Sequence, residues 1–355
     1  MKYPALLSFN DINAQLDQFD TIIDVRSPSE FADDHIPGAI NCPVLNDEER
    51  QRVGTLYKQV SAFDAKKMGA AMVSRHIAHH IDTHFNDKPR DWSPLIYCWR
   101  GGNRSGAMAY ILARIGWPVI QLDGGYKDYR RFVNSYLLAM PAQFQFYVIC
   151  GPTGSGKSRL LQKLTAQGAQ VLDLEKLAAH RGSVLGSLPS VQQPSQKSFE
   201  SSIWQTLRHF NPDRPVFVES ESKKIGNLRV PDALMEKIRS SHCITLELSR
   251  ANRVQLLLQD YAHFVTYPST LISKLECLIP LQGKEKILQW QIMARSGEMA
   301  CLFDALLVHH YDPAYSRSIA RNFLSIDQAK KIVLEDISEG AFDTATLRIA
   351  ELILS

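Results

Sequence analysis

The chain of 355 residues is too long for one ordinary domain and predicts about two. Its content of 45% hydrophobic and 22% charged residues is typical of globular proteins and excludes a disordered chain, a collagen and a coiled coil. The net charge of +3, from 40 basic and 37 acidic residues, neither requires nor excludes a nucleic-acid partner.

The first part of the chain alternates short apolar runs with helical segments, which predicts an α/β domain. Ser27 is the expected N-cap of an early helix, with Pro28 at its first position and Glu30 completing a capping box. The predicted strands are 21–25, 95–98 and 118–122, and the later helices are 105–115 and 127–138.

The periodicity breaks near residue 140, and we expect one domain at 1–140 and a second at 141–355. The second part again predicts an α/β domain, with a helical C-terminal extension because apolar residues beyond 270 follow helical spacing. Its strands are expected at 145–150 and near 169–174, 215–220 and 242–248, and its helices after 156 and from about 196, 231 and 249.

Cys98 stands at the end of a predicted strand, before a glycine-containing loop that leads into a helix. The N–H groups of such a loop and the N-terminus of the helix favour a thiolate, so we predict that Cys98 is a nucleophile. Arg100 and Arg104 would hold an anionic donor beside the sulfur. A buried, inert cysteine is the alternative, but it leaves the glycines and arginines unexplained.

Residues 151–158, GPTGSGKS, fit the phosphate-loop pattern G-x-x-x-x-G-K-[ST] between a predicted strand and a predicted helix. Its glycines would let backbone N–H groups surround a polyphosphate, and the loop does not distinguish a nucleotide from another diphosphate. Lys157 would contact the terminal phosphate, and Ser158 is placed to bind Mg²⁺. The predicted phosphate-binding residues are Gly151, Thr153, Gly154, Ser155, Gly156, Lys157 and Ser158.

Acidic residues at the ends of two later strands are candidates to position a metal ion or a water molecule. Asp173 and Glu219 are the first choices, with Glu175 and Glu221 as their neighbours. Acidic residues at strand ends are often merely solvated, so each of these is a hypothesis.

The six cysteines, at positions 42, 98, 150, 243, 277 and 301, contain no C-x-x-C pair, which argues against a zinc site or a disulfide framework. No stretch reaches the roughly 20 apolar residues of a membrane span, and the start of the chain lacks the pattern of a signal peptide. We therefore expect a reduced, cytoplasmic protein without a membrane partner.

Residues 24–31 (DVRSPSEF) and 35–41 (HIPGAIN) resemble the N-terminal signature of rhodanese domains, and 122–126 (LDGGY) resembles their C-terminal signature. In that family the loop cysteine carries a persulfide. Five residues separate Cys98 from Arg104, where common rhodaneses have four. This spacing is similar to that of dual-specificity phosphatases of the same fold, and it implies room for a tetrahedral anion.

The pairing of a rhodanese-like domain with a P-loop domain resembles bacterial tRNA 2-selenouridine synthases, over most of residues 10–260. The resemblance implies an enzyme that acts on wobble-position 2-thiouridine in tRNA. It implies that geranyl diphosphate alkylates the sulfur and that selenophosphate then supplies selenium, without a tightly bound cofactor. The further segments that carry the resemblance are 53–58, 97–102, 174–183 and 218–226.

On this interpretation the P-loop would hold geranyl diphosphate, the Cys98 loop would hold selenophosphate, and Trp99 could stack on a base near the anticodon. Three alternatives remain open: a rhodanese-type sulfurtransferase coupled to a nucleotide-binding module, a phosphatase or kinase-like protein, and a non-catalytic binding module. The basic residues considered for contact with tRNA phosphates are Lys223, Lys224, Arg229, Arg250 and Arg253.

Overall fold

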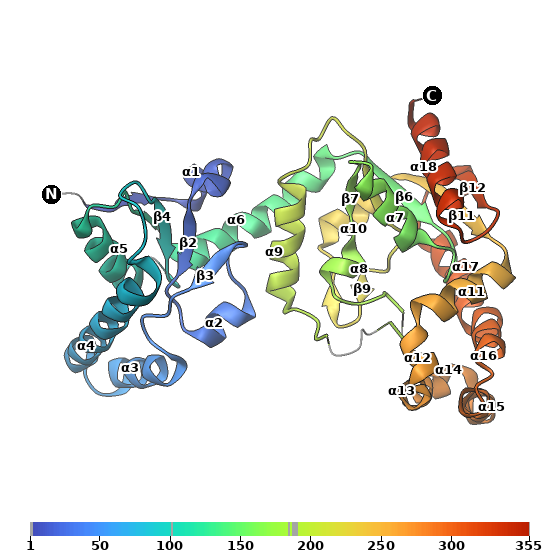
Figure 1. Ribbon diagram of the computed structural model, residues 1–355, viewed down its shortest axis with the longest axis horizontal. Coiled ribbons are helices and arrows are strands. Elements are labelled where there is room, and N and C mark those ends of the chain that lie inside the picture. The colour runs from blue at the N-terminus through green and yellow to red at the C-terminus, as the bar shows by residue number, and fades with distance from the viewer. Residues whose placement is uncertain (1–2, 101, 184, 187–190, 355) are drawn as a thin grey trace. The chain divides into compact units, whose positions relative to one another are not determined.

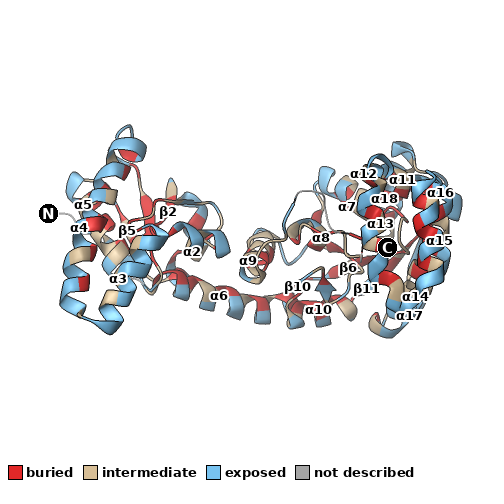
Figure 2. Ribbon diagram, turned by 90° about the horizontal axis from the view of Figure 1, so that it is seen from below, coloured by how far each residue is buried: buried red, intermediate tan, exposed pale blue. Residues whose placement is uncertain are grey.

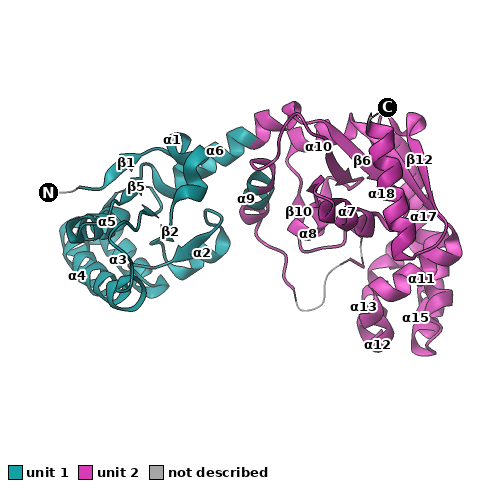
Figure 3. Cartoon of the chain, turned by 45° about the horizontal axis from the view of Figure 1, so that its top comes forward, with its two compact units in different colours: residues 1–136, 200–205 teal, residues 137–199, 206–355 magenta. Residues whose placement is uncertain are grey.

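The computed structural model describes residues 3–100, 102–183, 185–186 and 191–354, and its elements are labelled in Figure 1. The chain forms two compact units. Each contains a parallel sheet and helices, in agreement with the predicted α/β fold class. Unit 1 comprises residues 1–136 and 200–205, and unit 2 comprises residues 137–199 and 206–355 (Figure 3).

Unit 1 contains a five-stranded parallel sheet in the order β1-β5-β4-β2-β3. The central strand β4 is buried along its whole length, in agreement with its unbroken apolar sequence. Cys98 directly follows this strand, at the edge where the carboxyl ends of parallel strands meet and ligands commonly bind. The strands are β1 (Ala5–Leu7), β2 (Thr21–Asp24), β3 (Ala39–Asn41), β4 (Pro94–Tyr97) and β5 (Ile120–Leu122).

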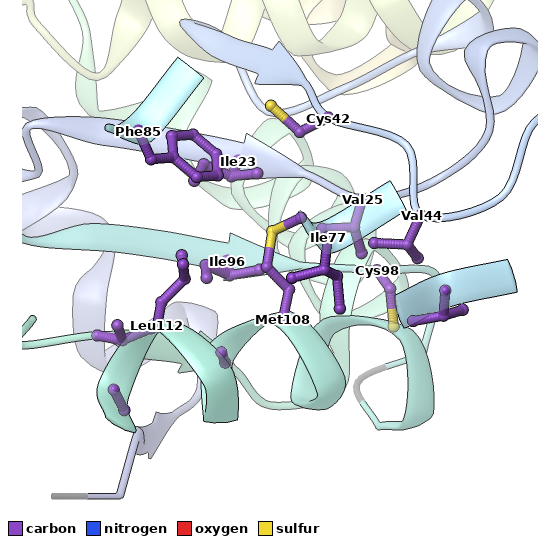
Figure 4. Packing of buried hydrophobic residues seen from close by; sticks show 14 of the residues in the cluster. Ile23, Val25, Cys42, Val44, Ile77, Phe85, Ile96, Cys98, Met108 and Leu112 are labelled. Atoms are coloured by element: carbon purple, nitrogen blue, oxygen red, sulfur yellow. The ribbon is translucent and has the colours of Figure 1, made fainter. Parts of the chain in front are cut away.

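The helices of unit 1 begin where the sequence carries capping residues. Ser27 and Glu30 form the predicted capping box at the start of α2, with Pro28 in its first turn. An apolar cluster joins the sheet to α4 and α5, and Figure 4 shows Cys98 among its members. The helices are α1 (Phe9–Ile12), α2 (Pro28–Asp33), α3 (Asp47–Gln59), α4 (Ala62–His80), α5 (Asn103–Ile115) and α6 (Gly125–Ala139).

Unit 2 contains a second five-stranded parallel sheet, in the order β12-β11-β6-β8-β7. The sequence predicts mostly helix beyond residue 270, but β12 (Lys330–Leu334) pairs with β11 there. Two exposed lysines begin this short edge strand, which weakens its apolar pattern. The other strands are β6 (Phe146–Cys150), β7 (Gln170–Leu172), β8 (Val216–Glu219) and β11 (His242–Leu248), with a separate antiparallel pair β9 (Lys224–Ile225) and β10 (Leu228–Arg229).

Helices of unit 2 form two apolar clusters, one in the region of α11–α16 and one that joins α7 and α18 to the sheet. Figure 2 shows buried residues on one side of many of these helices and exposed residues on the other. None of the described helices has the length and apolar character needed to cross a bilayer. The helices are α7 (Lys157–Ala166), α8 (Leu174–Leu177), α10 (Asp232–Arg239), α11 (Arg250–Asp260), α12 (Ala262–Thr266), α13 (Pro268–Leu275), α14 (Ile279–Gln282), α15 (Lys284–Arg295), α16 (Met299–Leu306), α17 (Asp312–Asn322) and α18 (Glu339–Leu354). The helix α9 (Gln196–Leu207) is divided, because its residues 200–205 belong to unit 1 and the rest to unit 2.

Candidate functional site

The thiol of Cys98 lies between the end of β4 and the start of α5, and the residue is 5% exposed. The Ser105 hydroxyl in the first turn of α5 donates a hydrogen bond to Cys98 Sγ at 3.3 Å. Ser105 Oγ in turn accepts a hydrogen bond from Gln121 Nε2 on β5 at 3.2 Å. Because the amide occupies a lone pair of the hydroxyl oxygen, the hydroxyl proton is directed to the sulfur, where it would stabilise negative charge that develops in a reaction. The sequence analysis missed both residues.

The two arginines of the Cys98 loop have different surroundings. Arg100 is exposed, whereas Arg104 Nη1 donates to Glu30 Oε2 at 2.9 Å. Arg50 approaches the same carboxylate oxygen at 2.9 Å. Burial disfavours the charged carboxylate, but the hydrogen bond and charge of Arg104 outweigh it, so the pKa of Glu30 lies below its ordinary value. Gly101 of this loop lies outside the described residues.

A buried cation, Arg26, supports the aromatic residue that follows Cys98. The guanidinium pairs with Asp24 at 2.6 Å and lies 3.9 Å from the centre of the Tyr126 ring. Trp99 stacks on the same Tyr126 ring, with 5.3 Å between ring centroids. Since Tyr126 already covers one face of Trp99, the stacking on a base that the sequence suggests would need the other face of the indole.

The predicted P-loop connects β6 to α7. Gly154 and Gly156 have φ angles of +76° and +90°, a conformation that glycine adopts far more readily than other residues. A Cβ atom at Gly156 would lie 2.8 Å from the ring of Phe342 in α18. Lys157 Nζ donates to the Gly151 carbonyl at 2.9 Å, so its ammonium lies back across the loop. Ser155 is fully buried within this turn.

Arg253 of α11 holds the P-loop in place. Its Nε and Nη2 donate to the Thr153 carbonyl at 2.9 and 2.7 Å, and Nη2 pairs with Asp312 at 2.6 Å. Arg253 is only 6% exposed, so the suggested contact with tRNA phosphates is wrong for this residue. Of the other basic residues considered, Lys223 pairs with Asp232 and Arg250 with Asp304, while Lys224 and Arg229 are exposed.

The acidic candidates fall into two groups. Asp173 caps α8 by accepting a hydrogen bond from the Lys176 backbone N–H at 2.9 Å, which gives it a structural role. Glu175, Glu219 and Glu221 instead form a carboxylate cluster: one oxygen from each lies within 4.8 Å of the others. The sequence named all three glutamates but could not show that they meet.

The carboxylates of this cluster are harder to ionise than ordinary glutamates. Burial raises the pKa of Glu219 to about 7, against the opposing charge of Lys157. Burial likewise raises the pKa of Glu175 and of Glu221, and each is close to the other acids of the cluster. The cluster therefore places three carboxyl groups that resist ionisation beside the P-loop lysine.

These observations define the class of the protein as a rhodanese-like α/β domain with a cysteine loop, joined to an α/β domain with a P-loop. The family model of the rhodanese-like domain matches residues 8–132. The model of the tRNA 2-selenouridine synthase AAA domain matches residues 144–271.

Relatives that match most of this chain show which family it belongs to. The tRNA 2-selenouridine synthase of Nitrosomonas europaea is 37% identical over 281 residues, which cover 77% of this chain and 71% of the relative. That of Hydrogenovibrio crunogenus is 30% identical over 333 residues, which cover 86% and 91%. A rhodanese-related protein of known structure from Thermoplasma volcanium matches 37% of this chain and 93% of its own, with 18% identity and a TM-score of 0.25. The chain belongs to the tRNA 2-selenouridine synthase family.

Proposed function

We propose that this chain converts 2-thiouridine at the wobble position of tRNA to 2-selenouridine, through an S-geranyl intermediate. One observation carries the proposal: a member of this family contains both a cysteine whose sulfur accepts a hydrogen bond from a hydroxyl and the complete sequence motif of a P-loop. The relatives bear the name of that synthase, and a tRNA substrate is consistent with a reaction in the cytoplasm.

In the first step the P-loop holds geranyl diphosphate. The sulfur of 2-thiouridine attacks C1 of the geranyl group, the C–O bond to the diphosphate breaks, and pyrophosphate leaves. The loop amides and Lys157 stabilise the negative charge that grows on the leaving group. A Mg²⁺ ion at Ser158 and Glu219, whose oxygen atoms suit it, would neutralise part of the same charge.

In the second step selenium replaces the alkylated sulfur. A thiocarbonyl sulfur is a poor leaving group, whereas an S-geranyl group can depart as a thiol. The Cys98 loop receives selenophosphate, with Arg100 and Arg104 as the cations for its phosphate part. The selenium of selenophosphate attacks C2 of the base, the C–S bond breaks, and the geranyl group leaves as a thiol with the proton of the selenophosphate. Water, activated by the Cys98 thiolate, then cleaves the P–Se bond, so phosphate leaves and selenium stays on C2.

The test is mass spectrometry of the wobble base after thiolated tRNA is incubated with geranyl diphosphate and selenophosphate. Wild-type enzyme is expected to form 2-selenouridine. Lys157→Ala is expected to form neither product, because the first step fails. Cys98→Ala is expected to form the S-geranyl base but no 2-selenouridine, because only the second step fails.

Lys284→Ala and Cys277→Ala are matched controls, because both side chains are exposed in unit 2. Both should give wild-type products. Unchanged thiolated tRNA with folded wild-type enzyme and both donors would refute the proposal. Consumption of thiosulfate and turnover of ATP instead would favour the sulfurtransferase alternative.

A further inference from the structure

The carboxylate cluster of unit 2 lies beside the P-loop and consists of three glutamates whose oxygen atoms lie close together. Glu219 ends β8, Glu221 follows two residues later, and Glu175 lies in the first turn of α8. One oxygen from each lies within 4.8 Å of the other two. This separation is compatible with three oxygen ligands around one cation, because Mg²⁺ and Mn²⁺ bind oxygen atoms at about 2.0–2.2 Å.

Glu219 provides a second, independent indication of a ligand. The residue is 2% exposed, and its Oε1 is buried without a hydrogen-bond partner among the residues that the structure describes. Unpaired buried carboxylate oxygens are strongly disfavoured, because they lose hydration without gaining a donor. An oxygen atom in this state, on a carboxylate that lies close to two further carboxylates, is typical of a ligand position.

The backbone closes the cluster on one side. Gly182 has a φ angle of +62°, and a Cβ atom there would lie 2.6 Å from both Glu175 Oε1 and Glu221 Oε2. Glycine thus permits the backbone to approach the two carboxylates more closely than any other residue would. Such close approach limits the water available to the carboxylates and increases their need for a positive counter-charge.

The charge of the surroundings is also suited to a divalent cation. Lys157 is the cation that acts on all three carboxylates, and Asp173 adds a further negative charge nearby. One ammonium group can offset the charge of only one carboxylate when all three are ionised. Lys157 Nζ is moreover engaged with the Gly151 carbonyl at 2.9 Å. A hard divalent ion would supply the missing charge, and carboxylate oxygens are its preferred ligands.

We propose that Glu175, Glu219 and Glu221 form a protein-built site for a divalent cation of the Mg²⁺ and Mn²⁺ class, which binds without any phosphate ligand. Mg²⁺ is usually held by one or two carboxylates together with substrate phosphates, so a site with three carboxylates from the protein differs from that arrangement. The cation would be in place before the diphosphate arrives. The inference deepens the proposed function but does not depend on it, because metal binding can be measured without tRNA.

The experiment titrates Mn²⁺ into metal-free, full-length protein in phosphate-free buffer, with the free ion measured by electron paramagnetic resonance. Wild-type protein is expected to bind one Mn²⁺ ion saturably. Glu175→Gln, Glu219→Gln and Glu221→Gln are each expected to weaken binding at least about tenfold, because each removes a charged ligand. Glu236→Gln, an exposed residue of α10, is the control for loss of one charge and should bind as wild type does.

A second measurement serves any variant that folds poorly. Mn²⁺ is expected to raise the melting temperature of wild-type protein and of Glu236→Gln, but not that of the folded variants of the cluster. The proposal is overturned if wild-type protein binds no Mn²⁺ below about 1 mM, the weak limit of protein-built sites. It is also overturned if the three cluster variants bind Mn²⁺ as tightly as wild type. Neither result would bear on the formation of selenouridine, which the tRNA assay measures separately.

Discussion

The hydroxyl of Ser105 is the group that we expect to control the reactivity of Cys98, because it contacts the sulfur directly. Ser105 donates to Cys98 Sγ, and Gln121 holds the hydroxyl in that orientation. A hydrogen bond to an ionised group contributes about 1.5–3 kcal/mol. Loss of the donor therefore removes one hydrogen bond to the sulfur without removing the cysteine itself.

We expect Ser105→Ala to slow the alkylation of Cys98 by iodoacetamide at pH 7 by about tenfold, because roughly 1.4 kcal/mol corresponds to a factor of ten. The rate is measured by mass spectrometry of the Cys98 peptide at pH 7. The exposed Cys277 is the internal reference and should react at an unchanged rate. Equal Cys98 rates in both proteins would contradict this role.

The start of α7 lies close to α18, a helix that is far from it in the sequence. Gly156 precedes α7 and has a φ angle of +90°, and a Cβ atom there would lie 2.8 Å from the Phe342 ring. Gly168, just beyond the end of α7, has a similar φ angle of +79° but nothing within 4 Å of such an atom. An alanine at either position would be strained by the positive φ angle, but only an alanine at Gly156 would also clash with a neighbouring side chain.

We expect Gly156→Ala to lower the free energy of unfolding by about 1–3 kcal/mol more than Gly168→Ala does, since overpacking adds to the cost of a positive φ. Urea unfolding of the two variants measures the difference. Equal losses would mean that α18 moves away without cost, and the proposed fit between the P-loop and Phe342 would be wrong.

At the scale of the whole molecule, the C-terminal residues belong to the core of unit 2. β12 pairs with β11 over residues 330–334, and α18 packs on α7 through Phe342 and Ile349, both buried. Unit 1 has a separate apolar cluster around Cys98. Damage to the end of the chain should thus reach the P-loop and leave the Cys98 loop intact.

We expect Phe342→Ala to destabilise unit 2 by about 3–5 kcal/mol, the usual cost of truncating a buried phenylalanine. The alkylation rate of Cys98 should not change. Leu347→Ala is the control, because this residue of the same helix is 64% exposed and should cost less than about 0.5 kcal/mol. Thermal unfolding and Cys98 alkylation, measured on the same samples, check both parts. A slower Cys98 reaction in Phe342→Ala would show that the two units are not independent.

The sequence by itself determined the features that depend on neighbouring residues. Apolar runs predicted the strand that ends before Cys98 and the strand that leads into the P-loop. Ser27, Pro28 and Glu30 predicted the start of α2, because capping involves residues only three apart. The family could also be inferred from short motifs. Such features need no knowledge of what lies across the fold.

Only the tertiary structure decided which side chains meet. Ser105 with Gln121, Arg104 with Glu30, and Arg253 with the Thr153 carbonyl are contacts between segments separated in the sequence, and no local pattern encodes them. The same holds for β12, whose pairing with β11 depends on burial at a sheet edge. The three glutamates could be named from the sequence, but only folding brings their oxygen atoms together, because the end of β8 and the first turn of α8 must converge.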